Sequence, residues 1–153
     1  MWSLDEKDSM NSKYFKSRWR KWVKLTSKQK IIEKNTALIQ KETRMKKGVY
    51  IVRVSKPVDR VIGKSDIVYI GEGTLHRRLR RVLKVFPERI TEKSKKQKNL
   101  LARWGLLLIV KKFDADVWIT YKITNKHKDL EKKLLQKYRN DHIENPPLNS
   151  NSR

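Results

Sequence analysis

The segment IVYIGEGTLHRRLRR, Ile67 to Arg81, places a tyrosine, two glycines and four arginines side by side. Its first half is typical of a buried strand, and the leucines of its second half recur at helical spacing after Thr74, which can cap a helix. At 100° per residue, Arg78 lies at the edge of the apolar face, so its guanidinium should emerge beside the sheet. Arg78 is a candidate site residue, although arginine stems commonly cover the edge of a core. The other cations of this helix should face away from the core and position phosphates: Arg77, Arg80, Arg81 and Lys84.

Glu131 is a second candidate, because it interrupts the apolar stripe of a helix expected over His127 to His142. The stripe consists of Leu130, Leu134, Leu135 and Tyr138. A carboxylate there is costly unless it is compensated. The compensation could be a lysine or arginine, or a hard divalent ion such as Mg²⁺, which binds oxygen ligands. His127, one turn earlier on the same face, is a weaker candidate for a second ligand.

The composition favours a nucleic-acid partner. The 153 residues include 39 Lys and Arg against 16 Asp and Glu, a formal net charge of +23 that a polyanion would neutralise. A membrane surface is the competing partner, but no apolar run approaches the ~20 residues of a spanning helix. The first ten residues lack the basic-then-apolar order of a signal peptide, so we expect a cytoplasmic protein. Without cysteine, any chemistry must use oxygen and nitrogen groups.

These residues should be positioned by a small α/β (α+β) domain. Strands are expected over 48–54, 67–71 and 114–124, with a long connecting loop over 55–66 and a polar loop over 87–99. The first two strands should form an antiparallel hairpin. The fold class is therefore a three-stranded antiparallel sheet flanked by helices, over residues 48–153.

Residues 1–47 are expected to form a basic helical extension. Two helical stripes are visible in it, and they consist of Phe15, Trp19, Trp22 and Val23, and of Ile31, Ile32, Leu38 and Ile39. Packing on the rest of the protein is the ordinary interpretation. Because Trp19 and Trp22 are interleaved with Arg and Lys, contact with nucleic acid is the alternative.

Taken together, five elements resemble the ordered signature of the GIY-YIG nuclease family. They are GVY at 48–50, YIG at 69–71, Arg78 in the following helix, Glu131 in a later helix, and Asn149 in PPLN. The resemblance covers about two thirds of the chain. The spacing between GVY and YIG is longer than is common in the family, and Val82 stands where some members carry a histidine.

The resemblance implies metal-dependent hydrolysis of a phosphodiester, in which water attacks phosphorus in line with the departing 3′ oxygen. Glu131 would hold one Mg²⁺ or Mn²⁺, and Arg78 would stabilise the phosphoryl oxygens. Tyr50, with Tyr69 beside it, would activate or orient the attacking water. Because free tyrosine has a pKa of about 10, Tyr50 can act as a base only if cations lower that pKa or if it passes the proton onward. Asn149 would orient Glu131 or close the site from behind.

Gly71 and Gly73 would let the backbone approach the nucleic acid closely. We expect a DNA endonuclease that nicks as a monomer, since one site with one metal cuts one strand; a homodimer would be needed for a concerted double-strand cut. DNA and RNA both fit the charge. The alternatives are a non-catalytic nucleic-acid-binding module and a structural basic protein associated with RNA.

Overall fold

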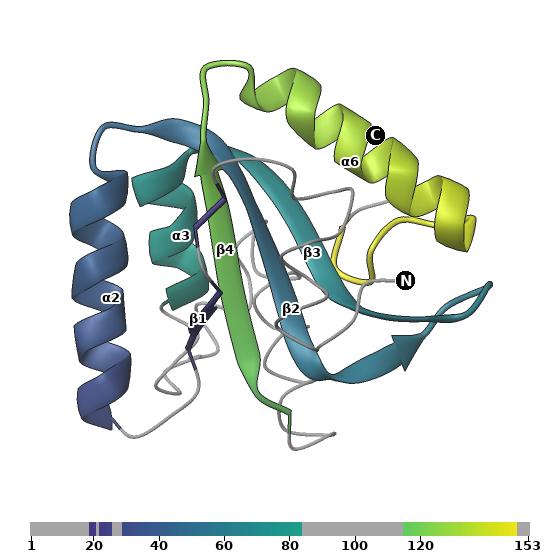
Figure 1. The fold of residues 1–153 in the computed structure, drawn as a ribbon, viewed down its shortest axis with the longest axis horizontal. Coiled ribbons are helices and arrows are strands. Elements are labelled where there is room, and N and C mark those ends of the chain that lie inside the picture. The colour runs from purple at the N-terminus through teal and green to yellow at the C-terminus, as the bar shows by residue number, and fades with distance from the viewer. Residues whose placement is uncertain (1–18, 21, 26–28, 84–114, 150–153) are drawn as a thin grey trace, which may run out of the picture.

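The computed structural model describes residues 19, 20, 22–25, 29–83 and 115–149. Within these ranges, four antiparallel strands form one sheet in the order β1-β4-β2-β3 (Figure 1). The strands are β1 (Val23–Lys24), β2 (Lys47–Asp59), β3 (Lys64–Thr74) and β4 (Val117–Ile123). The helices are α2 (Gln29–Thr43), α3 (Leu75–Leu83) and α6 (His127–His142). The predicted α+β class is confirmed, with four strands in place of three.

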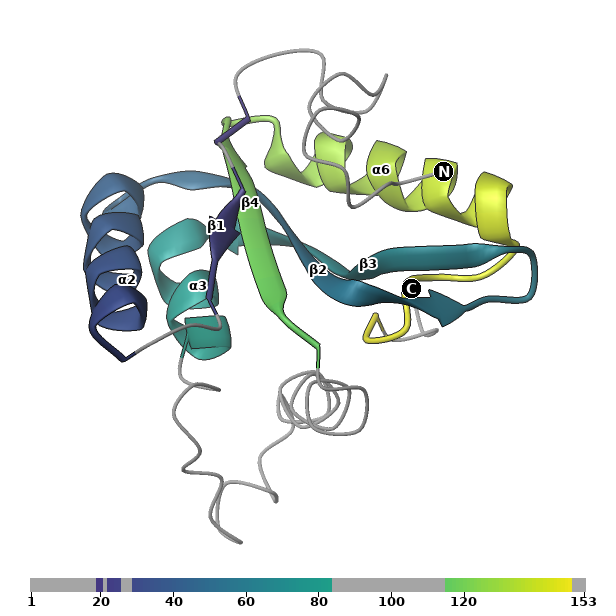
Figure 2. The same cartoon turned by 60° about the horizontal axis from the view of Figure 1, so that its bottom comes forward.

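The sheet has an apolar cluster on each face, because successive strand residues point to opposite sides. On one face Tyr50 and Val52 pack with Leu75 and Leu79 of α3. On the other face the cluster joins β2 and β3 to α6, through Val49, Ile51, Ile67, Ile70, Leu134 and Tyr138. Figure 2 shows α6 running along β3, away from the paired helices α2 and α3.

An irregularity in the β2–β3 ladder sets which face Ile67 occupies. Val52 pairs with Tyr69 and Arg53 pairs with Ile67, so Val68 is an extra residue in β3. Tyr69 lies on the face of Tyr50 by regular alternation, and the bulge moves Ile67 to the opposite face, where it packs against α6.

The loop expected over 55–66 is mostly strand. β2 continues to Asp59 and β3 begins at Lys64, around a turn in which Gly63 has φ 71°. Pro57 is tolerated because the pairing of β2 with β3 is interrupted between Arg53 and Val58, so no backbone N–H is needed at position 57. The proline and glycine of this segment suggested a loop, but here they mark an irregular ladder and its turn.

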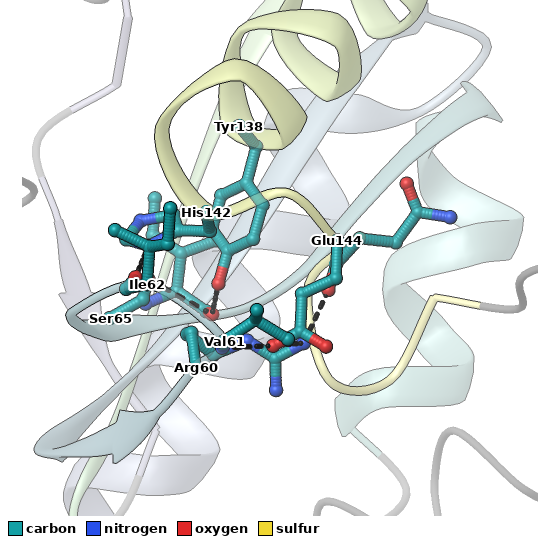
Figure 3. A network of polar contacts seen from close by, with 9 residues as sticks. Arg60, Val61, Ile62, Ser65, Tyr138, His142 and Glu144 are labelled. Atoms are coloured by element: carbon teal, nitrogen blue, oxygen red, sulfur yellow. Dashed lines mark hydrogen bonds and ion pairs between the residues drawn. The ribbon is translucent and has the colours of Figure 1, made fainter.

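The hairpin turn is fastened to the end of α6 (Figure 3). Arg60 pairs with Glu144 at 2.9 Å, and the Val61 amide donates to the same carboxylate at 2.9 Å. Nδ1 of His142 lies 2.8 Å from the Ile62 carbonyl oxygen. These contacts hold the long β2–β3 hairpin against the C-terminal end of the helix.

The described part of the N-terminal segment belongs to the same fold. β1 pairs with β4, and α2 packs on α3. Trp19, Trp22 and Val23 do not lie in a helix as expected; Val23 is in β1, and both tryptophans pack against the α6-side cluster. The guanidinium of Arg53 lies 4.3 Å from the ring centroid of Trp22, which supports the packing interpretation.

The helix predicted over 127–142 and the strand predicted within 114–124 are confirmed. Phe15 and the loop expected over 87–99 lie outside the described residues. No helix in the described ranges is long and apolar enough to cross a membrane.

Candidate active site

Tyr50 and Tyr69 lie together at the centre of the candidate site. Their ring centroids are 5.7 Å apart, and Tyr50 is buried while Tyr69 is half-buried. Gly71 is the β3 partner of Tyr50, and a methyl group on Gly71 would lie 2.6 Å from the Tyr50 hydroxyl oxygen. The glycine therefore makes room for the tyrosine, so that the hydroxyl can lie across the neighbouring strand.

Arg78 lies across the same strand two residues further on. A methyl group on Gly73 would be 3.1 Å from the Arg78 Nε, and Gly73 has φ 127°, a conformation that suits glycine. Arg78 is half-buried, as expected for the edge of the α3 apolar face. The space that a Cβ would take at these two glycines is occupied by Tyr50 and Arg78. That Gly71 and Gly73 let nucleic acid approach the backbone stays a prediction.

Glu131 is half-buried on α6, in the stripe formed by Leu134 and Tyr138. The charge of Arg78 lowers the pKa of Tyr50 and the charge of Glu131 raises it, so both charged groups act on this hydroxyl. Tyr50, Tyr69 and Arg78 therefore lie together on the α3 side of the sheet, and the charge of Glu131 acts on the Tyr50 hydroxyl from α6, which packs on the other side.

The net effect on Tyr50 is opposite to the one that a base requires. Burial raises the pKa of Tyr50 well above its ordinary value, and the neighbouring Tyr69 raises it further. Arg78 opposes this rise without cancelling it. Tyr50 is therefore a neutral phenol at physiological pH, suited to orient a water molecule by hydrogen bonding.

Glu72 and His127 link the two halves of the site. His127 Nδ1 is hydrogen-bonded to the Glu72 carboxylate, and both side chains are largely buried. Glu72 lies between Gly71 and Gly73 on β3, and His127 begins the helix that carries Glu131. His127 was a weaker candidate for a metal ligand, and Glu72 was not predicted as a site residue. The available signal was an acidic residue between the two glycines, because strand alternation directs its side chain to the α6 face.

Asn149 is hydrogen-bonded to the edge of β3. Its side-chain oxygen accepts from the Ile70 amide at 3.0 Å, and its amide nitrogen donates to the Ile70 carbonyl at 2.8 Å. The Leu148 amide also donates to the Val68 carbonyl at 2.9 Å. Asn149 thus pairs with β3 like a short added strand, directly before Gly71, and fixes the C-terminal segment behind the site.

The cations predicted to contact phosphate divide into two groups. Arg77 and Arg80 are exposed on α3. Lys84 and the side chain of Arg81 lie outside the described part of the protein.

The donor set fits a hard divalent ion held by few protein ligands. Within the described ranges, no group of three or more His, Asp or Glu side chains is arranged to hold a metal. Mg²⁺ is commonly held by one or two carboxylates, with water and substrate phosphate completing its shell. Glu131 supplies one such carboxylate at the edge of the site, so the residues present fit Mg²⁺ bound together with substrate.

Comparisons with protein-family models, with curated proteins and with solved structures found no match to this chain.

Proposed function

We propose that the protein is a metal-dependent endonuclease that hydrolyses phosphodiester bonds of DNA at a GIY-YIG-like site. The observation that carries the proposal is that Tyr50, Tyr69 and Arg78 lie together at one end of the β2–β3 ladder, with the charge of Glu131 acting on the Tyr50 hydroxyl. A structural role alone does not require a half-buried arginine and a half-buried glutamate to act on one buried tyrosine hydroxyl.

The residues of the site would divide the work as follows. Arg78 would bind the phosphoryl oxygens by charge-assisted hydrogen bonds and stabilise the charge that develops on them. Tyr50, held by Gly71 and Tyr69, would orient the attacking water. Glu131 would hold Mg²⁺, which when bound would neutralise charge on the phosphate and the departing oxygen.

Cleavage of supercoiled plasmid tests the proposal. At low salt with Mg²⁺ or Mn²⁺, we expect the wild-type protein to convert supercoiled DNA to the nicked form, and EDTA to prevent this. Glu131→Gln should bind plasmid without cutting it. Asp129→Asn is the matched control, because it removes one exposed carboxylate from the same helix and should leave cutting unchanged.

If wild-type protein binds DNA and RNA substrates, branched ones included, but cuts none of them with either metal, the catalytic proposal is wrong. The protein would then be a nucleic-acid-binding module in which Glu131 is a structural charge.

A further inference from the structure

The turn between α2 and β2 is a tight corner whose side chains all point into solvent. Residues 44–47 are each exposed, and Met45 has 88% of its surface accessible. The corner is closed by a hydrogen bond from the Lys46 amide to the Thr43 carbonyl at 3.0 Å. A backbone hydrogen bond therefore fixes the corner, whereas its side chains are exposed to solvent.

The exposed side chains of this corner carry three positive charges: Arg44, Lys46 and Lys47. No ion pair joins any of them to an acid within the described ranges. The nearest acid in the sequence, Glu42, is occupied elsewhere, since it pairs with Arg20 at 2.9 Å and accepts a hydrogen bond from Tyr121. Adjacent unpaired cations repel one another, and an anionic partner would remove that cost.

The corner is fixed next to the candidate active site. The Leu75 amide, at the start of α3, donates to the Lys46 carbonyl at 2.9 Å. Lys47 pairs with Thr74 across the ladder, next to Gly73, where Arg78 lies. Lys47 precedes Tyr50 by three positions of extended strand, a span of about 10 Å along the backbone.

Met45 is unusual both in its exposure and in its backbone. Its φ of 60° lies in the left-handed region, which non-glycine residues seldom occupy. Glycine or asparagine would suit this position better, yet the chain has a long apolar side chain projecting between cations. Proteins that bind nucleic acid use such apolar side chains against sugars and base edges beside phosphate contacts.

We infer that the α2–β2 corner, residues 44–47, binds the nucleic-acid backbone beside the reacting phosphate, with Arg44, Lys46 and Lys47 on phosphates and Met45 against the adjoining sugar or base edge. The inference rests on the proposed function for its substrate, and it adds a binding surface that α3 alone does not provide. Arg77 and Arg80 lie on α3, which begins against this corner, so the corner and α3 together would form one basic surface beside the site.

The salt dependence of duplex binding, measured in EDTA so that no cleavage occurs, tests the inference. Arg44→Ala with Lys46→Ala should reduce the slope of log K against log salt by about 1.8, since each phosphate contact contributes about 0.9. As the salt concentration rises from 50 to 200 mM, the affinity of the wild type should therefore fall about 12-fold more than that of this variant. Lys56→Ala with Lys64→Ala is the matched control, because it removes two exposed cations at the far end of the hairpin and should leave the slope unchanged.

Met45→Gly tests the apolar contact separately, because glycine accepts the φ of this position and removes only the side chain. It should weaken duplex binding about fivefold without changing the salt slope. Unchanged affinity would remove Met45 from the interface.

Equal slopes for the two double variants would overturn the inference. A corner variant that keeps its duplex slope but loses binding to phosphatidylserine vesicles would assign the surface to membranes and would also overturn it. Wild-type protein that binds the duplex with the expected slopes but fails to cut it with Mg²⁺ would contradict the proposed function and leave the corner contact standing.

Discussion

At the scale of single residues, the site depends on glycines that make room for larger side chains. The Cβ that alanine would place at Gly71 would lie 2.5 Å from the Tyr50 ring, closer than real Cβ contacts, and the ring is buried and cannot move freely. The position of the Tyr50 hydroxyl is therefore coupled to the absence of a side chain on the neighbouring strand.

Gly71→Ala should both destabilise the protein and displace Tyr50. Overpacking of this kind costs about 1–3 kcal/mol in the free energy of unfolding, which denaturant titration would measure. Plasmid cleavage by the folded variant should fall at least tenfold. Gly63→Ala is the control: its methyl group would meet open space, but φ 71° costs about 1–2 kcal/mol, so it should lose stability and keep activity. Normal cleavage by folded Gly71→Ala would show that the tyrosine position is not critical.

Several residue-level features were predictable and others were not. Arg78 and Glu131 stood out because charged groups interrupt apolar stripes, and both are half-buried in the structure. The raised pKa of Tyr50 was not predictable, since it depends on burial and on groups that lie far apart in the sequence. The contact of Gly71 with Tyr50 depends on strand register, which the sequence does not specify.

At the scale of elements, the site is assembled across the join between β3 and α6. Lys126, the N-cap residue of α6, makes no side-chain capping hydrogen bond. The His127 ring, bonded to Glu72, is instead the contact that ties the start of this helix to the strand next to Tyr50 and Arg78. If Glu131 acts as proposed, Glu72 and His127 would position it, because Glu131 lies one turn into the same helix.

Glu72→Ala should lower kcat for oligonucleotide cleavage about tenfold or more with little change in KM, since misplacement by 1 Å can cost 10²-fold. Glu72→Gln keeps a hydrogen-bond acceptor for His127 and should recover most of the loss. Steady-state kinetics on a labelled duplex would measure both. Equal losses for the two variants, or a change confined to KM, would contradict a positioning role.

The elements themselves were predicted unevenly. The helix over 127–142 was identified closely because its apolar stripe is long and regular. The antiparallel hairpin was predicted correctly, but its outer part over 55–66 was mistaken for a loop because Pro57 and Gly63 are usual loop residues. Pro57 instead lies in a stretch of β2 that is not paired with β3, and Gly63 lies in the turn. β1 has only two residues and no periodicity that could reveal it; its pairing with β4 is determined by tertiary structure.

At the scale of the whole molecule, the composition predicted a polyanion partner but gave no indication of a buried acid. Asp66 is 1% exposed, and burial raises the pKa of its carboxyl from 3.8 to about 7, with the charge of Arg53 opposing the rise. Between pH 3.8 and about pH 7, Asp66 is therefore protonated in the folded state and ionised in the unfolded state. Its contribution to stability is fully present below pH 3.8 and is lost as pH rises through about 7.

Asp66→Asn should remove this pH dependence. Relative to the wild type, the variant should gain about 4 kcal/mol in free energy of unfolding between pH 4 and pH 8, since each pKa unit is worth about 1.36 kcal/mol. Asp59→Asn, at an exposed acid, should give a difference near zero throughout. Denaturant titrations at each pH would measure these values. A constant difference between Asp66→Asn and wild type would contradict the raised pKa.

The measurement that tests the central claim most directly is analysis of the strand ends left on a labelled DNA duplex. Wild-type protein with Mg²⁺ should produce cuts that carry a 3′ hydroxyl and a 5′ phosphate, and Glu131→Gln should bind the same duplex and leave it intact. Cutting that persists in Glu131→Gln or in EDTA would contradict a metal site at Glu131. Products with a 3′ phosphate would contradict attack opposite the departing 3′ oxygen, and with it the proposed chemistry.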